Sequence, residues 1–310
     1  MNRGEKVLVA GAETLIGSAI IRQLKHQGCS DLFTETIDFA DAKAVDNYFS
    51  RTQPDYVFVA AGKSGGIGAN QKFPADLIRD NLLVACHIIQ SAYLNRATKL
   101  LYLASSCCYP KLCPQPMRVE SLFTGPLEHT NAAYALAKLS GIELCRAYRF
   151  QYGVNFISAI PANAFGPGDD FSLEDSHVVA ALIRKIHEAK AQSLPVVRVW
   201  GTGAPRREFI YADDLANGCI FLMLHYDAGE PINLGTEHDF SIKELAELIK
   251  EIIGYTGEIQ FDGSKPDGMP AKRLDSSRLR ELGWKPKTDF RAALEQTYQW
   301  YLANVDQVRS

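Results

Sequence analysis

Hydroxyls and thiols gather in one short segment of this 310-residue chain, S-S-C-C-Y-P-K at residues 105–111. The segment follows the apolar run 100–104, which has the length and composition of a buried strand. A loop at the end of a strand would more often use Gly, Asn or Asp. The two thiols are therefore either inert packing groups or groups that face a reaction.

A tyrosine and a lysine at four-residue spacing, Tyr134 and Lys138, form a second candidate. That spacing places both side chains on one face of a helix. A free tyrosine titrates near pH ~10, too high for easy proton transfer at neutrality. We expect the neighbouring ammonium to favour the phenolate and to bring the pKa of Tyr134 toward the working range. The pair alone is a weak signal, because Y-x-x-x-K often occurs by chance.

A turn bounded by glycines, G-A-E-T-L-I-G at residues 11–17, follows the first apolar run and leads into a helical pattern. Such glycines let the backbone approach a pyrophosphate, which then lies at the helix N-terminus. Thr14 stands where the usual form has its middle glycine, so an ordinary strand–turn–helix stays open as the alternative. The position at the first strand favours a dinucleotide site. Its candidate residues are Gly11, Thr14, Leu15, Ile16 and Gly17.

Glu35 lies about where an acid at the end of the second strand binds the ribose 2′-hydroxyl of NAD. A carboxylate there would repel the 2′-phosphate of NADP. The residues alone therefore favour NAD, with a solvated glutamate at a strand end as the alternative.

The elements that position these residues alternate between short apolar strands and amphipathic helices. The alternation predicts an α/β fold, a Rossmann-type doubly wound parallel sheet with helices on both faces. Ligands bind outside the carboxyl ends of such strands, so Ser105, Cys107 and Tyr134 would face one crevice. The expected strands are 6–10, 32–36, 56–60, 100–104 and 155–160, and the expected helices are 18–26, 74–95 and 131–152.

The pattern changes near residue 160, which predicts two lobes. Residues 1–160 would form the dinucleotide-binding domain, with later segments returning to its sheet. Residues 161–310 would form mainly a smaller C-terminal α/β substrate lobe. Its expected elements are helices 177–191, 242–253 and 292–304 and strands 196–200 and 232–234.

Composition and charge argue against several classes of protein. The net charge of -3 leaves no basic footprint for nucleic acid, and no apolar run is long enough to span a membrane. Seven cysteines at scattered spacing, without a secretory pattern in residues 1–6, predict reduced thiols in the cytoplasm. No second C-x-x-C or histidine cluster completes a zinc set around Cys107, so no metal is expected.

Several motifs together resemble the extended short-chain dehydrogenase/reductase family, nearly from one end of the chain to the other. Within it, they resemble the branch that epimerises and reduces GDP-linked 4-keto sugars. The Cys107 segment and S-H-V are specific to this branch, whereas Y-x-x-x-K is not. The motifs are A-A-G-K-S-G-G-I at 60–67, S-S-C-C-Y-P-K at 105–111, Q-P-M at 115–117, T-N-A-A-Y-A-L-A-K at 130–138, S-H-V at 176–178, W-G-T-G-A-P-R-R-E-F at 200–209 and K-P-D-G at 265–268.

The resemblance implies conversion of GDP-4-keto-6-deoxy-D-mannose to GDP-L-fucose, by epimerisation at C3 and C5 and NAD(P)H reduction at C4. It implies that Ser105 polarises the C4 carbonyl, that Tyr134 protonates its oxygen, and that Lys138 tunes Tyr134 and holds the nicotinamide ribose. By the same resemblance, Cys107 and His177 match the pair that moves protons at C3 and C5. A thiol and an imidazole both titrate near neutrality and can share that work. Taken alone, His177 would be a surface histidine and Cys107 a buried packing residue.

The resemblance also implies residues that bind the two nucleotides. Arg207 and Lys272 would lie near the GDP pyrophosphate or the sugar, and Trp200 would contact guanine. A solvated arginine and a core tryptophan are the alternatives. The remaining matches are Asn163, in an N-x-x-G-P loop near nicotinamide and substrate, Ala61 in the cofactor crevice, and Lys63 on the substrate side of that crevice.

Departures from the family pattern leave the cofactor and the sugar open. Glu13 and Ile37 stand where the family carries arginines for the NADP 2′-phosphate, so these positions favour NAD while the family implies NADP. The loop Asn163-Ala164-Phe165 is smaller and more apolar than the family form, and Cys108 replaces an aliphatic residue. Both changes are compatible with another GDP-sugar, such as a heptose or a dideoxyhexose.

Three functions therefore remain. The first is the GDP-4-keto-sugar epimerase/reductase. The second is a related nucleotide-sugar epimerase or 4-reductase, including one with retained NAD, and the third is a non-catalytic dinucleotide sensor. A sensor has no need to keep all five catalytic matches. Homodimers are common in the family, with helices 74–95 and 131–152 as the expected interface.

Overall fold

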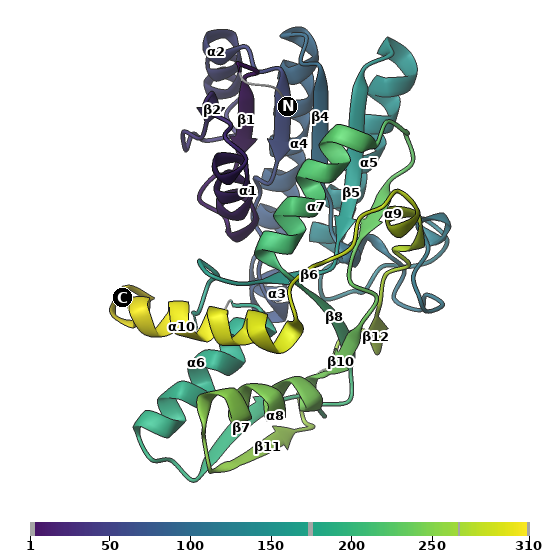
Figure 1. The fold of residues 1–310 in the computed structure, drawn as a ribbon. Coiled ribbons are helices and arrows are strands. Elements are labelled where there is room, and N and C mark those ends of the chain that lie inside the picture. The colour runs from purple at the N-terminus through teal and green to yellow at the C-terminus, as the bar shows by residue number, and fades with distance from the viewer. Residues whose placement is uncertain (1–3, 173–175, 266, 309–310) are drawn as a thin grey trace.

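Short apolar segments pair in parallel to form the central sheet of this computed structural model (Figure 1). The structure describes residues 4–172, 176–265 and 267–308. Residues 1–3, at the start of the segment without a secretory pattern, and Pro266 of K-P-D-G lie outside them. The sheet order is β2-β1-β3-β4-β5-β9, and each of these pairings is parallel. Its strands are β1 Val7–Ala10, β2 Leu32–Phe33, β3 Tyr56–Val59, β4 Lys99–Leu103, β5 Asn155–Pro161 and β9 Ile232–Leu234.

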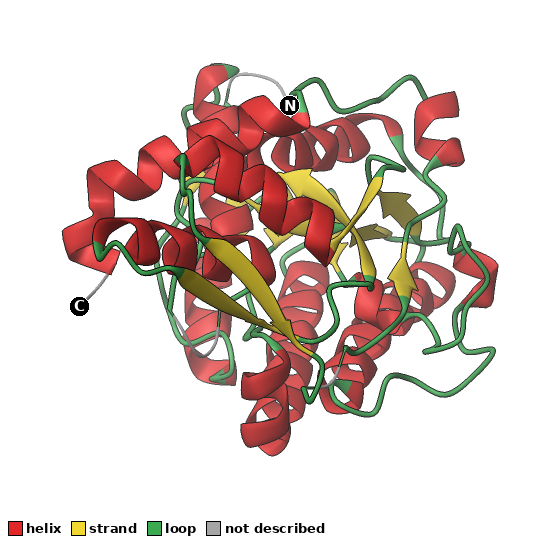
Figure 2. Ribbon diagram, turned by 90° about the horizontal axis from the view of Figure 1, so that it is seen from below, coloured by secondary structure: helices red, strands yellow, loops and turns green. Residues whose placement is uncertain are grey.

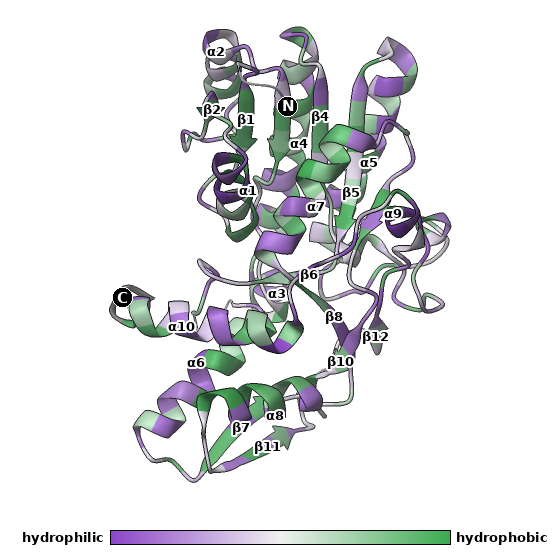
Figure 3. Cartoon of the chain, in the orientation of Figure 1, coloured by the Kyte–Doolittle hydropathy of each residue, from purple (hydrophilic) through white to green (hydrophobic). Residues whose placement is uncertain are grey.

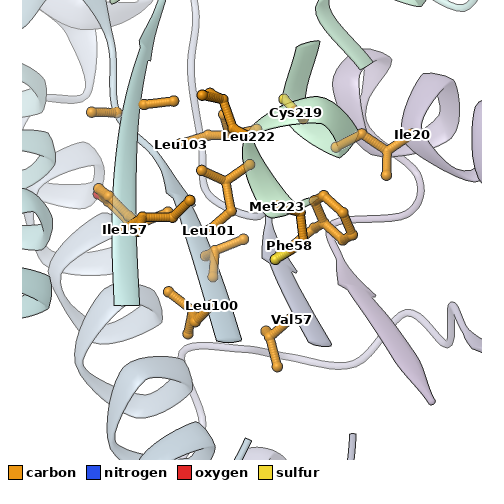
Figure 4. Close-up of a cluster of buried hydrophobic side chains, with 14 of the residues drawn as sticks. Ile20, Val57, Phe58, Leu100, Leu101, Leu103, Ile157, Cys219, Leu222 and Met223 are labelled. Carbon is orange, nitrogen blue, oxygen red and sulfur yellow. The ribbon is translucent and has the colours of Figure 1, made fainter. Parts of the chain in front are cut away.

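Helices cover both faces of this sheet (Figure 2). Strands β1 and β4 are buried along their whole length, as continuous apolar runs are when both faces are covered. Helices α1 (Leu15–His26) and α7 (Ala212–His225) pack together over one face, where Ile20 and Met223 meet Phe58 (Figure 4). The other face carries α2 (Ala42–Thr52), α4 (Pro74–Leu94) and α5 (Ala132–Tyr152).

A second hydrophobic cluster forms the smaller lobe. Helix α8 (Ile242–Ile253) presents Leu245, Ala246 and Ile249 to this core, and its apolar stretches are green in Figure 3. The lobe's other elements are α6 Val178–Ala191, α10 Phe290–Val308, β7 Val196–Trp200 and β11 Glu258–Asp262.

A small mixed sheet lies where the two lobes meet (Figure 1). Its central strand β8 (Arg206–Tyr211) is antiparallel to β10 (Asp239–Ser241) and parallel to β6 (Asn163–Phe165) and β12 (Ala271–Lys272). This sheet brings segments far apart in the sequence beside the carboxyl ends of the central strands. The remaining short elements are α3 Ile67–Lys72, η1 Ser106–Cys108, η2 Val119–Ser121 and α9 Ser277–Glu281.

The order of the central strands reverses at β1, which has β2 on one side and β3 on the other. In an open α/β sheet, ligands bind in the crevice beyond the carboxyl ends of the strands at such a point. The 11–17 turn leaves β1 there, and the segment 60–67 leaves β3 beside it. The topology therefore fixes where a dinucleotide would bind.

The predicted fold class is confirmed, and most element bounds differ by a few residues at most. Strand β2 is shorter than predicted because the backbone N–H of Glu35 donates to the Tyr48 hydroxyl (3.1 Å) instead of continuing the strand ladder. Helix α1 begins earlier than predicted because Thr14 caps it. The segment 232–234 returns to the central sheet as β9, beside β5. The division into domains at residue 160 stays a prediction, and no helix in the described residues is long and apolar enough to cross a membrane.

Candidate active site

A cavity of about 950 Å³ lies beyond the carboxyl ends of the central strands, with residues of the second lobe on its opposite wall. This volume lies near the upper end of the range of about 300–1,000 Å³ that is usual for the binding sites of small molecules and cofactors. Most of the predicted site residues meet on its walls, whereas Gly11, Gly17 and Glu35 do not line it. The predicted residues that line it are Thr14, Leu15, Ile16, Ala61, Lys63, Ser105, Cys107, Tyr134, Lys138, Asn163, His177, Trp200, Arg207 and Lys272.

The two glycines shape the first turn from behind the cavity wall. A Cβ on Gly11 would lie 2.6 Å from the Ala61 backbone, and a Cβ on Gly17 would lie 1.9 Å from the Gly11 carbonyl oxygen. Thr14 replaces the middle glycine by bonding locally: its hydroxyl donates to the Gly11 carbonyl (2.8 Å) and accepts from the Gly17 N–H (3.0 Å). The close packing brings the N-terminus of α1 to the cavity, where a phosphate can accept hydrogen bonds from backbone N–H groups of the first helical turn.

Ser105, Tyr134 and Lys138 approach the cavity from β4 and α5. Ser105 caps the short helix η1, and its Oγ accepts from the Cys107 N–H (3.2 Å). Tyr134 lies in the first turn of α5 and Lys138 one turn later. The Lys138 Nζ donates to the Leu103 carbonyl oxygen (3.2 Å) and lies 5.9 Å from the centre of the Tyr134 ring. The ammonium is thus held by the end of β4, above the tyrosine ring.

The expected lowering of the Tyr134 pKa is wrong for this structure. Burial raises the pKa of the Tyr134 phenol, the neighbouring Cys107 raises it further, and a hydrogen bond with Ser105 opposes the shift only in part. Burial also lowers the pKa of Lys138 to about 8. Tyr134 is therefore protonated at neutral pH, the state required of a proton donor.

Cys107 is the thiol with the most polar surroundings in the Ser105–Lys111 segment. The Lys272 Nζ lies 3.1 Å from its Sγ, and the Asn131 Nδ2 lies 3.3 Å from the same atom. Burial acts to raise the pKa of this thiol, but the charge of Lys272 and hydrogen bonds from Ser105 and Lys272 outweigh it and lower the pKa. The adjacent Cys108 is fully buried, and burial raises its pKa to about 12, so it is the inert packing group.

His177 reaches the cavity from the second lobe, as the N-cap of α6. Its ring is accessible from the cavity, yet the surrounding protein lowers the pKa of the imidazole. Lys272 acts in the same direction, and Asp170 opposes it. A thiol from η1, just beyond β4, and an imidazole from the other lobe thus line one cavity.

The predicted nucleotide-binding side chains lie on the second lobe and at the rim. Trp200 is 63% exposed, so the core alternative is wrong; the ammonium groups of Lys185 and Lys265 lie 5.8 and 5.5 Å from its ring centre. The partly buried Arg207 donates to the Arg206 carbonyl at 2.8 Å. Lys63 is the exposed partner of Asp80, with 2.5 Å between Nζ and Oδ2.

The two glutamates near the first turn have different surroundings. Glu35 pairs with Arg51 at 2.5 Å, and the Arg51 guanidinium also lies over the Tyr48 ring. Glu13 lines the cavity, and its carboxylate accepts from the Thr36 hydroxyl (3.3 Å). Of these two glutamates, Glu13 is therefore the one at the cavity wall, whereas the sequence placed Glu35 at the ribose.

Comparison with known proteins shows the family to which this chain belongs. A profile described as NAD dependent epimerase/dehydratase family matches residues 7–235. The chain belongs to the NAD dependent epimerase/dehydratase family. This confirms the resemblance drawn from the motifs.

Individual relatives are similar over nearly their whole length. "Putative GDP-L-fucose synthase 2" from Arabidopsis thaliana is 48% identical over 310 residues, covering 99% of this chain and 94% of its own. The crystal structure of a GDP-L-fucose synthetase from Naegleria fowleri bound to NADP has a TM-score of 0.92 and 30% identity, and the match covers 100% of this chain and 98% of the other. A GDP-6-OMe-4-keto-L-xylo-heptose reductase from C. jejuni has a TM-score of 0.94 and 33% identity, and the match covers 98% of this chain and 99% of the other.

The walls of the cavity fit the dinucleotide that the family name implies. The N-terminus of α1 at the cavity wall and a glycine pair that leaves no room for a Cβ are suited to a pyrophosphate. In the described residues, no group of three or more His, Cys, Asp and Glu side chains could hold a metal ion.

Sequence reasoning missed several residues of the cavity. Asn131 could have been found, because it lies within the same motif as Tyr134. Lys185 could have been found from helix periodicity, since it follows Val178 and Leu182 on the cavity side of α6. Nothing local marked Asp169, whose Oδ2 is buried with no hydrogen-bond partner among the described residues and whose pKa burial raises to about 7.

Proposed function

We propose that this enzyme converts GDP-4-keto-6-deoxy-D-mannose to GDP-L-fucose, by epimerising C3 and C5 and then reducing C4 with NAD(P)H. It is both an isomerase and an oxidoreductase in this proposal. The observation that carries it is the meeting of two sets of groups in one cavity. Ser105, Tyr134 and Lys138 suit carbonyl reduction, and Cys107 and His177 suit inversion at carbon.

Inversion uses the acidity that the C4 ketone gives to its neighbours. When Cys107, as a thiolate, removes a proton from C3 or C5, the electron pair of the broken C–H bond delocalises into an enolate. His177, as an imidazolium, then returns a proton to the opposite face, and a new C–H bond forms. Because the pKa of His177 is lowered, the imidazolium is the minor form at neutral pH and, once formed, the stronger acid. Proton exchange with water restores both groups before the second centre reacts.

Reduction places a different demand on the same cavity. The nicotinamide cofactor supplies the hydride for C4 when it is bound. Ser105 donates a hydrogen bond to the C4 oxygen, and Tyr134 gives that oxygen its phenolic proton. Lys138, one helical turn away, offsets the negative charge that develops there.

Product analysis tests this proposal. The purified protein is incubated with GDP-4-keto-6-deoxy-D-mannose and NADPH or NADH, and the sugar is identified by NMR. GDP-L-fucose formed in step with cofactor oxidation supports the proposal. A product that keeps the mannose configuration at C3 and C5 would refute the epimerase half.

A reductase for a GDP-linked heptose is the second candidate. It is favoured by the similarity to the C. jejuni heptose reductase and by the small apolar loop Asn163-Ala164-Phe165. The same assay with a GDP-4-keto-heptose separates the candidates by their relative kcat/KM.

We propose NADH as the preferred cofactor, although a structural relative was solved with NADP. The Glu13 carboxylate at the cavity wall would repel a 2′-phosphate and accept from a 2′-hydroxyl. Glu35, which the sequence placed at the ribose, would contribute less because Arg51 neutralises it.

Glu13→Arg is therefore expected to shift the ratio of NADPH to NADH affinity toward NADPH. The arginine would gain a charge-assisted hydrogen bond to the 2′-phosphate, and the repulsion between the Glu13 carboxylate and that phosphate would be removed. Together these changes should alter the affinity ratio by a factor of about 10–100. Dissociation constants from nicotinamide fluorescence measure the shift. Glu247→Arg, which reverses an exposed charge on α8 away from the cavity, is the matched control. An unchanged ratio in Glu13→Arg would remove Glu13 from cofactor selection.

We also propose a cytoplasmic homodimer that buries the outer surface of α4 and α5. Leu94, Leu136, Phe150 and Tyr152 are exposed on these helices, and a second copy would cover them. Light scattering on the purified protein gives its mass in solution. The cytoplasmic assignment fits the seven free cysteines of the chain.

A further inference from the structure

We propose that Lys272 is the positioning residue that holds Cys107 as a thiolate, and not a ligand of the GDP pyrophosphate. The proposal deepens the function proposed above and rests on it. In this proposal, the contact between Lys272 and Cys107 keeps the thiol deprotonated, so that it can remove the protons at C3 and C5.

The contact is direct and partly enclosed. The Lys272 Nζ lies 3.1 Å from the Cys107 Sγ, and Lys272 is only 8% exposed. The Asn131 Nδ2 approaches the same sulfur at 3.3 Å. A sulfur that faces an ammonium and an amide N–H is placed as an acceptor, which a thiolate is and a thiol is only weakly.

The strand that carries Lys272 is held in place by hydrogen bonds, and it positions the ammonium beside the sulfur. It belongs to β12, where it pairs in register with Arg207 of β8. Just beyond it, the Leu274 N–H donates to the buried Glu208 carboxylate (2.6 Å), and the Arg273 N–H donates to the Gln115 side chain (2.8 Å). The backbone on the C-terminal side of Lys272 is therefore fixed to both lobes, which limits where its ammonium can reach.

Other charged or titratable groups near Cys107 do not take over this task. Arg207 acts on the thiol in the same direction, but Lys272 has the larger effect and is in contact with it. Tyr134 and Cys108, on the other side, are neutral at pH 7 because burial raises the pKa of each. The imidazole of His177 has its own pKa lowered, by burial and by Lys272, so it adds little positive charge at neutrality.

The test follows alkylation of Cys107 by iodoacetamide against pH, without substrate, with the modified peptide quantified by mass spectrometry. Only the thiolate reacts, so the midpoint reports the pKa of this thiol. In the unmodified protein, the midpoint is expected below the ~8.5 of a free cysteine. In Lys272→Met, it should rise by about 1–3 units, and alkylation at pH 7 should slow about tenfold or more.

Two further variants keep the result interpretable. Lys272→Arg keeps the positive charge and should recover most of the low midpoint, which a purely steric role would not predict. Lys185→Met removes another cation of the same cavity, and the midpoint should stay where it was. GDP affinity is measured in parallel by calorimetry.

An unchanged midpoint in folded Lys272→Met, with weaker GDP binding, would overturn the proposal and restore the phosphate role. Because alkylation needs no turnover, this failure is distinct from failure of the proposed function. That function is tested by the sugar product alone.

Discussion

Cys107→Ser is expected to slow epimerisation by about 10²–10⁴ and to leave reduction largely intact, because a hydroxyl cannot act as the base at neutral pH. The measurement is deuterium entry at C3 and C5 in D₂O, followed by NMR without cofactor. A second assay supplies the ketone already epimerised at both centres and follows cofactor oxidation. Rates in this assay should stay close to those of the unmodified enzyme, since Ser105, Tyr134 and Lys138 are unchanged.

Cys108→Ser is the matched control for this experiment. Its thiol is buried against α5, with Sγ 3.7 Å from the Ala135 carbonyl oxygen, and has no access to the cavity. The control should retain both activities. Equal loss of both activities in a well-folded Cys107→Ser would contradict the division of work between Cys107 and Tyr134.

Tyr134→Phe should have the opposite effect. Removing the phenolic proton should lower the rate of C4 reduction by about 10²–10⁴. Deuterium entry at C3 and C5 should persist, because Cys107 and His177 remain. Cofactor oxidation on the pre-epimerised ketone and NMR on the unreduced substrate measure the two steps separately.

Tyr152→Phe, at the C-terminal end of the same helix in the proposed dimer surface and outside the cavity, controls for the loss of a hydroxyl from α5. Reduction by Tyr134→Phe at close to the full rate would show that another group protonates the C4 oxygen. Loss of deuterium entry in this variant would show that Tyr134 also takes part in the inversion.

Local patterns in the sequence were enough for elements with clear signals at their ends. Helix α8 begins and ends where predicted, because Ser241 and Glu244 form a capping box at its start and Gly254 adopts the left-handed conformation at its end. Strands β7 and β9 also keep their predicted bounds. The strand-end rule correctly brought Ser105, Cys107 and Tyr134 to one cavity.

Contacts between residues far apart in the sequence, and the burial of individual side chains, could not be predicted from local sequence patterns. Strand β12 has two residues, too few for a pattern, and Lys272 meets Cys107 only because β12 pairs with β8. The pKa of Tyr134 moves upward because tertiary packing buries its phenol, which the i,i+4 spacing to Lys138 cannot reveal. The Glu35–Arg51 ion pair likewise depends on how α2 packs beside β2.

The proposed enzyme epimerises and reduces a GDP-4-keto-6-deoxy sugar in one cavity. The most direct test is to convert GDP-4-keto-6-deoxy-D-mannose in D₂O, with NADH and NADPH in separate reactions, and to identify the product by NMR. We expect GDP-L-fucose with deuterium at C3 and C5, formed faster with NADH than with NADPH. Reduced sugar without deuterium at either carbon, or deuterium entry with no oxidation of either cofactor, would contradict the proposal.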